Sequence, residues 1–234
     1  MICSYRGDQR KTEAAFVKDQ DIHDAIGIIR EEMPKWEATT MAQVAELTRD
    51  PFRVLIGTIL SLRTQDKTTH EACERLFALA DTPESMLAMS EQAIDDAIYP
   101  VGFHVTKAQN ILKVCRILVE EHRGKTPDDL EALIMLPGVG RKTANLVVTL
   151  GFNKPGICVD THVHRIFNRW GYVSTKMPDD TEFALRDKLP AEYWIPINDI
   201  LVTYGQNLCK PISPHCSICR LTDYCDRTGV DKHR

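Results

Sequence analysis

Residues 136–145 read LPGVGRKTAN and join two stretches in which apolar residues recur with helical spacing. The proline is expected to stop the first helix, because its ring cannot continue the backbone hydrogen bonding. Gly138 and Gly140 permit positive φ and the close approach of another backbone. The second helix is expected to begin at about Arg141, so that Arg141 and Lys142 add two positive charges to its start. The segment predicts a tight turn between two helices.

Helical signals continue along the rest of the chain. Thr82-Pro83-Glu84 and Thr126-Pro127-Asp128 each place a capping hydroxyl, a proline and an acid in the order typical of a helix start. Residues 106–122 carry a helical apolar face, which Gly124 is expected to end: Ile111, Leu112, Cys115, Leu118 and Val119. Sustained period-two alternation is absent. The pattern predicts an all-α fold of about ten helices.

Composition limits the class of protein. The 234 residues are 43% hydrophobic and 26% charged, as in an ordinary globular protein. No apolar run is long enough to span a bilayer, so no membrane partner is expected. The N-terminus lacks the apolar core of a signal peptide, which favours an intracellular, cytoplasmic protein, and residues 1–20 are expected to be partly disordered. The net charge of −4 argues against a dedicated nucleic-acid binder unless the contact is local.

The turn in residues 136–145 could provide such a local contact. The first N–H groups of a helix lack intrahelical partners, and together with the helix dipole they favour an anion. A plain connector remains one interpretation. The other is a helix-hairpin-helix that binds the DNA backbone, with candidate contacts at Gly138, Val139, Gly140, Arg141 and Thr143. Lys142 has two possible roles there, as a phosphate contact or as an amine nucleophile.

Asp160 is the next residue with candidate chemistry. It lies within GICVDTHVHRIFNRW, residues 156–170, directly before a helical apolar pattern. An aspartate in that position is first of all an N-cap. It could also deprotonate a nucleophile or stabilise a developing cation at a cleft. His162 and His164 diverge on a helix and therefore make a poor metal pair.

Four cysteines follow one another near the C-terminal end, with spacings of six, two and five residues: Cys209, Cys216, Cys219 and Cys225. Such a cluster in an intracellular protein indicates a metal site more often than disulfides. Zinc sites are generally built from two separated short pairs. The single Cys-x-x-Cys with uneven flanking gaps favours an iron–sulfur cluster, with zinc as the alternative.

The hairpin, the aspartate and the cysteine spacing, in this order, resemble the endonuclease III family of DNA glycosylases from about residue 25 to about residue 228. The resemblance implies that Lys142 attacks the deoxyribose, that Asp160 is the catalytic aspartate, and that His162 in the same segment contacts DNA. It also implies that a [4Fe–4S] cluster is bound by Cys209, Cys216, Cys219 and Cys225.

The family fold has two all-α lobes with DNA in the cleft between them. By similarity, residues 44–154 form a helical barrel lobe with the helix-hairpin-helix at about 131–150. Residues 1–43 and 155–234 form the cluster lobe, with the cluster loop at 209–225. Two residues are expected to fill the gap left by a flipped nucleotide, Phe103 and Arg63. Arg63 stands where the bacterial prototype has glutamine, so the preference for the opposite base cannot be carried over.

The implied activity is removal of oxidised pyrimidines such as thymine glycol from duplex DNA, followed by β-elimination at the abasic site. The expected protein is a monomeric, nucleoid-associated enzyme of prokaryotic type whose partner is double-stranded DNA with damaged pyrimidines or abasic sites. Two alternatives stay open. A monofunctional mismatch glycosylase of the same superfamily typically lacks a lysine at the position of Lys142. A non-catalytic, metal-stabilised DNA-binding module would need neither Lys142 nor Asp160.

Overall fold

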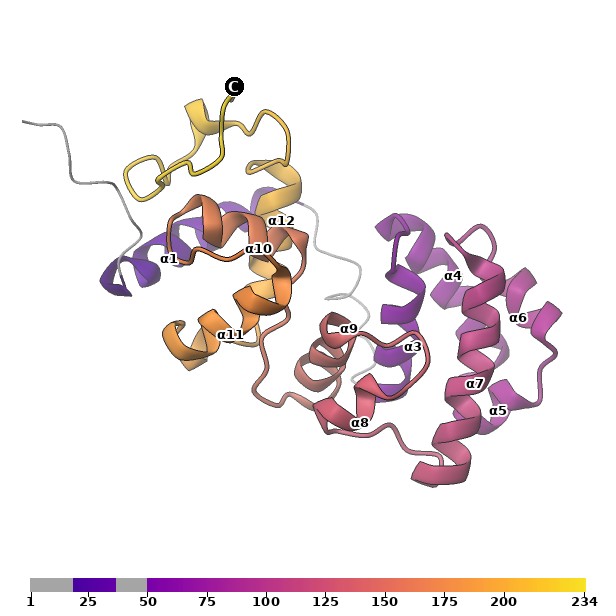
Figure 1. Cartoon of the computed structure of the whole chain (residues 1–234). Coiled ribbons are helices and arrows are strands. Elements are labelled where there is room, and N and C mark those ends of the chain that lie inside the picture. Colours follow the sequence, from indigo (N-terminus) through magenta and orange to yellow (C-terminus); the bar gives the residue numbers. More distant parts are fainter. Residues whose placement is uncertain (1–18, 37–49) are drawn as a thin grey trace, which may run out of the picture.

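The computed structural model describes residues 19–36 and 50–234, and over these residues the secondary structure is helical, without a strand (Figure 1). The predicted all-α fold is confirmed. The predicted disorder at the N-terminus lies outside the described residues, except that the 3-10 turn Asp19–Asp21 is formed. The proposed lobe boundary between residues 43 and 44 also lies outside them.

The helices form two lobes, each around its own cluster of buried apolar residues. The first lobe is built around the helix α3, in which every residue from Val54 to Leu60 is buried. Its elements are α3 (Pro51–Ser61), α4 (Asp66–Leu79), α5 (Pro83–Leu87), α6 (Glu91–Ile98), α7 (His104–His122), α8 (Leu130–Ile134), α9 (Arg141–Leu146) and the π-helical turn η3 (Val147–Gly151).

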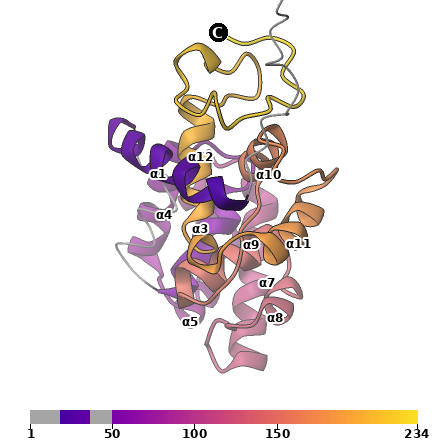
Figure 2. The same ribbon diagram turned by 90° about the vertical axis from the view of Figure 1, so that its left-hand side faces the viewer.

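The second lobe combines residues from both ends of the described chain. Its core contains Phe167 packed between the rings of Trp170 and Tyr172. The residues that follow α12 form a loop region beside α10 and α12, which ends at the C-terminus (Figure 2). The elements are η1 (Asp19–Asp21), α1 (Ile22–Glu32), η2 (Met33–Lys35), α10 (Thr161–Arg169), α11 (Pro178–Lys188), η4 (Ala191–Tyr193), α12 (Ile197–Asn207) and η5 (Cys216–Ile218).

Side-chain N-caps mark the starts of α3, α5, α6, α8 and α10. Two helix ends differ from the sequence-based expectation. Thr82 caps α5 as predicted. The predicted cap at Thr126 is wrong, because α8 begins later and is capped by Asp129, whose carboxylate accepts from the N–H of Ala132 at 2.9 Å. Helix α7 ends as expected near Gly124, but Arg123 already adopts the left-handed conformation before it, at φ 56°.

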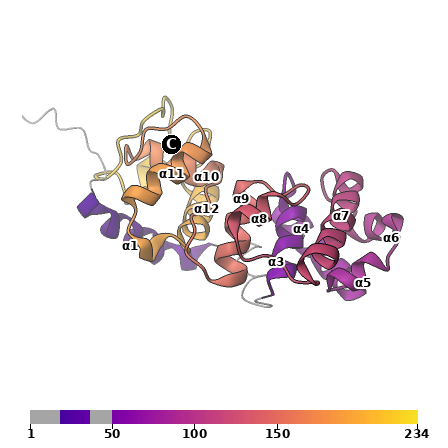
Figure 3. The same ribbon diagram turned by 60° about the horizontal axis from the view of Figure 1, so that its bottom comes forward.

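The lobes stand side by side, and α9 lies on the side of the first lobe that faces the second (Figures 1 and 3). Among the described helices, the closely packed pairs lie within one lobe or within the other. Within the described residues, the chain passes from the first lobe to the second through residues 152–160. Among the described residues, side chains on α9 make hydrogen bonds and an ion pair to the second lobe. None of the described helices combines the length and apolar character needed to span a membrane.

Candidate active site between the hairpin and helix α10

The turn between α8 and α9 has the predicted form, and α9 begins at Arg141. Gly138 needs to be glycine, since its φ is +80° and a Cβ would lie 2.9 Å from Nδ2 of Asn110. Gly140 is different: its φ is −93°, and a Cβ there would meet nothing within 4 Å. Positive φ is thus used at Gly138 only. The missing side chain at Gly140 leaves open space beside the helix start.

Two of the predicted DNA contacts have side chains that face the core. Val139 is 6% exposed and Thr143 is 2% exposed, so contact with DNA through either side chain is excluded in this arrangement. Their backbone groups remain candidates. The N–H of Ala144 donates to the carbonyl of Gly140 at 2.9 Å, so the N–H groups of the three preceding residues come before the first intrahelical bond.

Lys142 and Asp160 face each other across the two lobes. Nζ of Lys142 lies 4.0 Å from Oδ2 of Asp160, and the side chains are 42% and 9% exposed. The other carboxylate oxygen, Oδ1, accepts from the N–H groups of His162 at 2.8 Å and Val163 at 2.9 Å. One oxygen thus caps α10 while the other faces the amine. The two interpretations of Asp160, as a cap and as a partner of a nucleophile, are compatible in one residue.

His162 lies directly beside this pair. Its Nδ1 accepts from Nη2 of Arg165 at 3.0 Å. Burial lowers the pKa of the His162 imidazole below its ordinary value, which keeps the ring neutral at pH 7 and able to accept that bond. His164 turns instead toward Thr181, at 2.6 Å. The two histidines therefore have different partners, as their spacing predicts.

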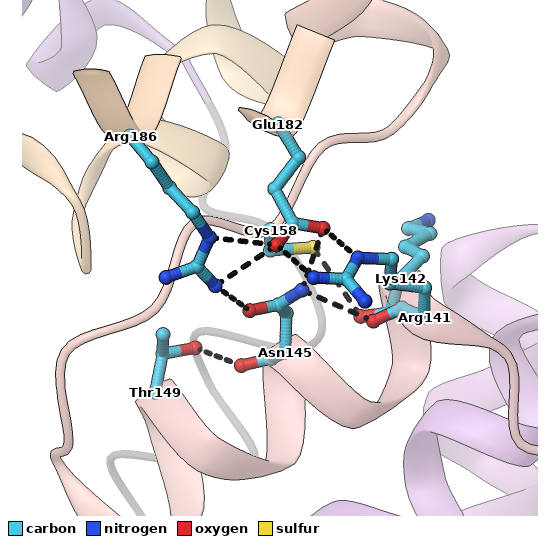
Figure 4. A network of polar contacts seen from close by, with 7 residues as sticks. All are labelled: Arg141, Lys142, Asn145, Thr149, Cys158, Glu182 and Arg186. Carbon is cyan, nitrogen blue, oxygen red and sulfur yellow. Dashed lines mark hydrogen bonds and ion pairs between the residues drawn. The ribbon is translucent and has the colours of Figure 1, made fainter. Parts of the chain in front are cut away.

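Arg141 points away from the open side of the hairpin. Its guanidinium donates to both carboxylate oxygens of Glu182 on α11, at 2.8 and 3.0 Å (Figure 4). The guanidinium also lies over the ring of Phe183, 4.7 Å from the centroid. The phosphate contact predicted for Arg141 stays a prediction, and it would require this ion pair to open. Sγ of Cys158 lies 3.6 Å from the carbonyl of Lys142.

The two predicted gap-filling residues come together from separate loops. Arg63 and Phe103 are both exposed and both left-handed, at φ 53° and 59°. The guanidinium carbon of Arg63 lies 5.6 Å from the centroid of the Phe103 ring. Buried Lys107 holds the first of these loops by donating to the carbonyls of Leu60 and Leu62. The structure thus brings the two side chains to one exposed place on the first lobe.

The four cysteines of the C-terminal loop line a single pocket, together with Arg169, Tyr204 and His215. Donors lie next to the sulfur atoms: Nη1 of Arg169 is 3.3 Å from Sγ of Cys209, and the Tyr204 hydroxyl is 3.0 Å from Sγ of Cys219. The buried Nε2 of His215 has no hydrogen-bond partner within the described part of the chain. Among the described residues, no three His, Cys, Asp or Glu side chains are grouped closely enough to hold a single metal ion. The residue types around the pocket, four thiols with a cation and a hydroxyl beside them, are nevertheless those of a four-thiolate metal or iron–sulfur site.

Comparisons with known proteins define the class. Residues 56–191 match the family described as HhH-GPD superfamily base excision DNA repair protein. Endonuclease III of Thermotoga maritima is 48% identical over 177 residues, covering 76% of this chain and 83% of the relative. Endonuclease III of Escherichia coli K12 is 38% identical over 176 residues, covering 75% and 83%.

Solved structures agree with the sequence relatives. The protein in "Structure of a non-covalent Endonuclease III-DNA Complex" superimposes with a TM-score of 0.79 at 32% identity, over 90% of this chain and 96% of that chain. The class is therefore the base-excision DNA glycosylases with a helix-hairpin-helix. Within it, the chain belongs to the endonuclease III family. Endonuclease III enzymes are bifunctional DNA glycosylases and lyases, and this chain is an enzyme of that family.

Two residues near the site were not predicted from the sequence, Glu182 and Lys107. Glu182 reads as half of an exposed pair with Arg186, because the two are spaced i, i+4 on a polar helix. Lys107 gave a usable signal: it lies four residues before Ile111, on the face of α7 that was predicted to be buried. A lysine on an apolar face indicates a specific partner, since lysine is almost never buried without one.

Proposed function

We propose that the chain excises oxidised pyrimidines such as thymine glycol from duplex DNA and then cleaves the abasic strand by β-elimination. The observation that carries the proposal is the separation of 4.0 Å between Nζ of Lys142 and Oδ2 of Asp160. An amine nucleophile needs a base within reach to remove its proton, and the cap holds the carboxylate of Asp160 in a fixed orientation.

In the proposed reaction, Oδ2 of Asp160 receives a proton from the Lys142 ammonium. The neutral amine attacks C1′ of the deoxyribose, the C1′–N bond breaks, and the base leaves with the bonding electrons. The departing base takes up a proton from the newly bonded nitrogen. The C1′–O4′ bond then breaks, O4′ takes up the proton held by Asp160, and the sugar opens to a protonated imine between C1′ and Nζ. Loss of a C2′ proton then expels the 3′ phosphate, because the imine accepts the electrons of the C2′–H bond. The strand is cut on the 3′ side of the lesion.

Binding of duplex DNA is assigned to the open side of the hairpin and to the loops of the first lobe. The helix start offers backbone N–H groups, and Gly140 leaves room for a phosphate. Arg63 and Phe103 are placed together and exposed, which suits the filling of the gap left by a flipped nucleotide. His162 lies next to Asp160 and would line the pocket of the flipped nucleotide. We expect the enzyme to act as a monomer in the cytoplasm, associated with the nucleoid.

The two lobes, with the proposed boundaries 44–154 and 1–43 plus 155–234, would border the DNA cleft. Cys209, Cys216, Cys219 and Cys225 would ligate a [4Fe–4S] cluster. When bound, the cluster would cross-link the loop 209–225 internally, and it would take no part in the reaction at the sugar. Purified protein is expected to be yellow-brown with visible absorption, and a colourless protein that contains zinc would refute the assignment.

Borohydride trapping on duplex DNA with thymine glycol or an abasic site tests the proposed nucleophile. Wild type should form a covalent adduct, and Lys142→Ala should form none. Lys154→Ala is the matched control: this lysine is 49% exposed, lies in the crossing segment and pairs with Asp128, so its loss should leave the adduct unchanged. Adduct formation by Lys142→Ala would overturn the assignment. Base release without an adduct in wild type would indicate a monofunctional glycosylase, and DNA binding without base release a non-catalytic module.

A further inference from the structure

Glu182 is a buried carboxylate that accepts hydrogen bonds from side chains of both lobes. Its side chain is 3% exposed. Oε2 accepts from Nε of Arg141 at 2.8 Å and from Nδ2 of Asn145 at 3.0 Å. Oε1 accepts from Nη2 of Arg141 at 3.0 Å and from Nε of Arg186 at 2.9 Å. A carboxylate offers about four lone-pair positions, so this one is fully used.

These bonds connect the two lobes. Glu182 and Arg186 belong to α11 of the second lobe, whereas Arg141 and Asn145 belong to α9 of the first lobe (Figure 4). The two α9 residues are one helical turn apart and are themselves joined, since Nδ2 of Asn145 donates to the carbonyl of Arg141 at 3.2 Å. Two separate points on one helix turn fix its rotation as well as its position.

Aromatic rings of the second lobe support both guanidinium groups. Arg141 lies over Phe183 at 4.7 Å, and Arg186 lies over Trp194 at 5.5 Å. Stacking adds to the ion pairs, because a planar guanidinium is attracted to an aromatic face. Glu182 and the side chains that donate to it, called the clamp below, are thus held in place by α11 and connect this helix to α9.

Lys142 follows Arg141 in the chain, and its side chain points away from Glu182. In Figure 4 its side chain leaves the helix start away from the network. Asp160, its partner at 4.0 Å, is fixed to the second lobe through the cap of α10. The described helices of the two lobes do not pack closely against each other, so the separation of amine and carboxylate needs another constraint. Glu182 supplies one.

We propose that Glu182 is a positioning residue that holds the start of α9 against the second lobe and thereby sets the distance between Lys142 and Asp160. It touches neither DNA nor the reacting atoms. The inference rests on the proposed function, since it concerns the same amine and carboxylate. Loss of the clamp leaves both cores intact and lets α9 turn or move away from α10. Reaction rate depends steeply on such a displacement, whereas binding of DNA does not.

The test is single-turnover trapping by Glu182→Gln, which keeps the shape but places an amide NH2 against guanidinium donors. The rate constant should fall about 100-fold, as for a misplacement of about 1 Å. The dissociation constant for duplex DNA with a tetrahydrofuran abasic analogue should change less than about threefold, because only an interaction that matters in the transition state is lost. If Glu182→Gln does not fold, Asn145→Ala serves instead, since it removes one of the two α9 side chains that donate to Glu182. It should lower the trapping rate constant by a smaller factor and leave DNA binding unchanged in the same way.

Thr181→Val is the matched control. Thr181 is the neighbouring residue on α11 and is fully buried, and within the described residues the bonds of its hydroxyl are to groups of the second lobe, His164 and Thr175 among them. Its loss should lower the melting temperature and keep the rate. Three results would overturn the inference. They are a wild-type trapping rate in Glu182→Gln, an equal loss of rate in Thr181→Val, and a loss of DNA binding in Glu182→Gln that parallels its loss of rate. Absence of an adduct in wild type would instead refute the proposed function.

Discussion

Lys107→Met should weaken the first lobe and loosen the loops that carry Arg63 and Phe103. Lys107 is 6% exposed, and its ammonium donates to the carbonyl of Leu60 at 2.8 Å, the carbonyl of Leu62 at 2.6 Å and Oγ1 of Thr64 at 3.2 Å. All three donors of the ammonium are therefore used. Methionine has a similar reach and volume without any donor.

The loss of stability in Lys107→Met follows from the three acceptors that lose the ammonium as a donor. A buried acceptor that loses its partner costs about 1–3 kcal/mol. Leu62 and Thr64 are only half-buried, so water can replace the lost donor there, while the carbonyl of Leu60 lies deeper in the core. Removing an ammonium from a buried site offsets part of the loss. We expect a net destabilisation of about 2 kcal/mol, which corresponds to a decrease of about 4–8 °C in melting temperature.

The same change reaches the DNA-facing loops. Oγ1 of Thr64 accepts from the N–H of Gly102 at 3.2 Å, so Lys107 stabilises the loop 61–66 and, through it, the residues before Phe103. Loosening these loops should weaken binding to duplex DNA with an abasic analogue. Lys113→Met is the control, since Lys113 lies on the same helix and is exposed. Thermal unfolding and DNA binding should both be unchanged in the control.

The pH dependence of stability provides a second measurement on the same residue. Burial lowers the pKa of Lys107 from its ordinary 10.5 to about 8. Between about pH 8 and pH 10.5, the unfolded chain binds a proton that the folded chain does not bind. The contribution of Lys107 to the free energy of unfolding therefore rises with pH in this window, and Lys107→Met should lack the rise. A melting temperature of the variant within about 1 °C of wild type at pH 7 would refute the reasoning on its cost.

Two further predictions concern the site itself. Asp160→Asn should keep the cap of α10, because asparagine is as good an N-cap, and should lower the trapping rate by about 10²–10⁴ through loss of the base, whereas an unchanged rate would exclude Asp160 as that base. Gly140→Ala should leave the melting temperature unchanged, since its Cβ meets nothing within 4 Å, and should weaken DNA binding, whereas Gly138→Ala should destabilise the fold because its φ is +80°. Retained DNA binding in Gly140→Ala would contradict a backbone contact at the hairpin.

Features fixed by neighbouring residues could be predicted from the sequence. The start of α9 at Arg141 and the cap of α10 by Asp160 depend on a few adjacent residues, and both are confirmed. The prediction failed where two local signals compete. Thr126 and Asp129 are both good caps before the same helix, and the structure uses Asp129, so that proline 127 precedes the helix and does not open it.

Features that depend on distant partners could not be predicted in the same way. Glu182 and Arg141 are 41 residues apart, and nothing in the polar helix around Glu182 distinguishes it from a solvated residue. The direction of Arg141 follows from that partner, which is why its charge was assigned to phosphate. The contact between Arg63 and Phe103 likewise joins two loops whose proximity arises only from the packing of α3, α4, α6 and α7.

The division of the reacting pair between two cores has a consequence for how mutations act. Lys142 is carried by the first lobe, and Asp160 is carried by the second lobe through its bonds to the start of α10. Substitutions inside either core change the stability of that lobe but leave the relation between the lobes unchanged. Substitutions in the Glu182 contacts change that relation and leave both cores packed. Rate and stability should therefore separate along the boundary between the lobes, with Glu182 affecting the rate and the neighbouring Thr181 affecting stability.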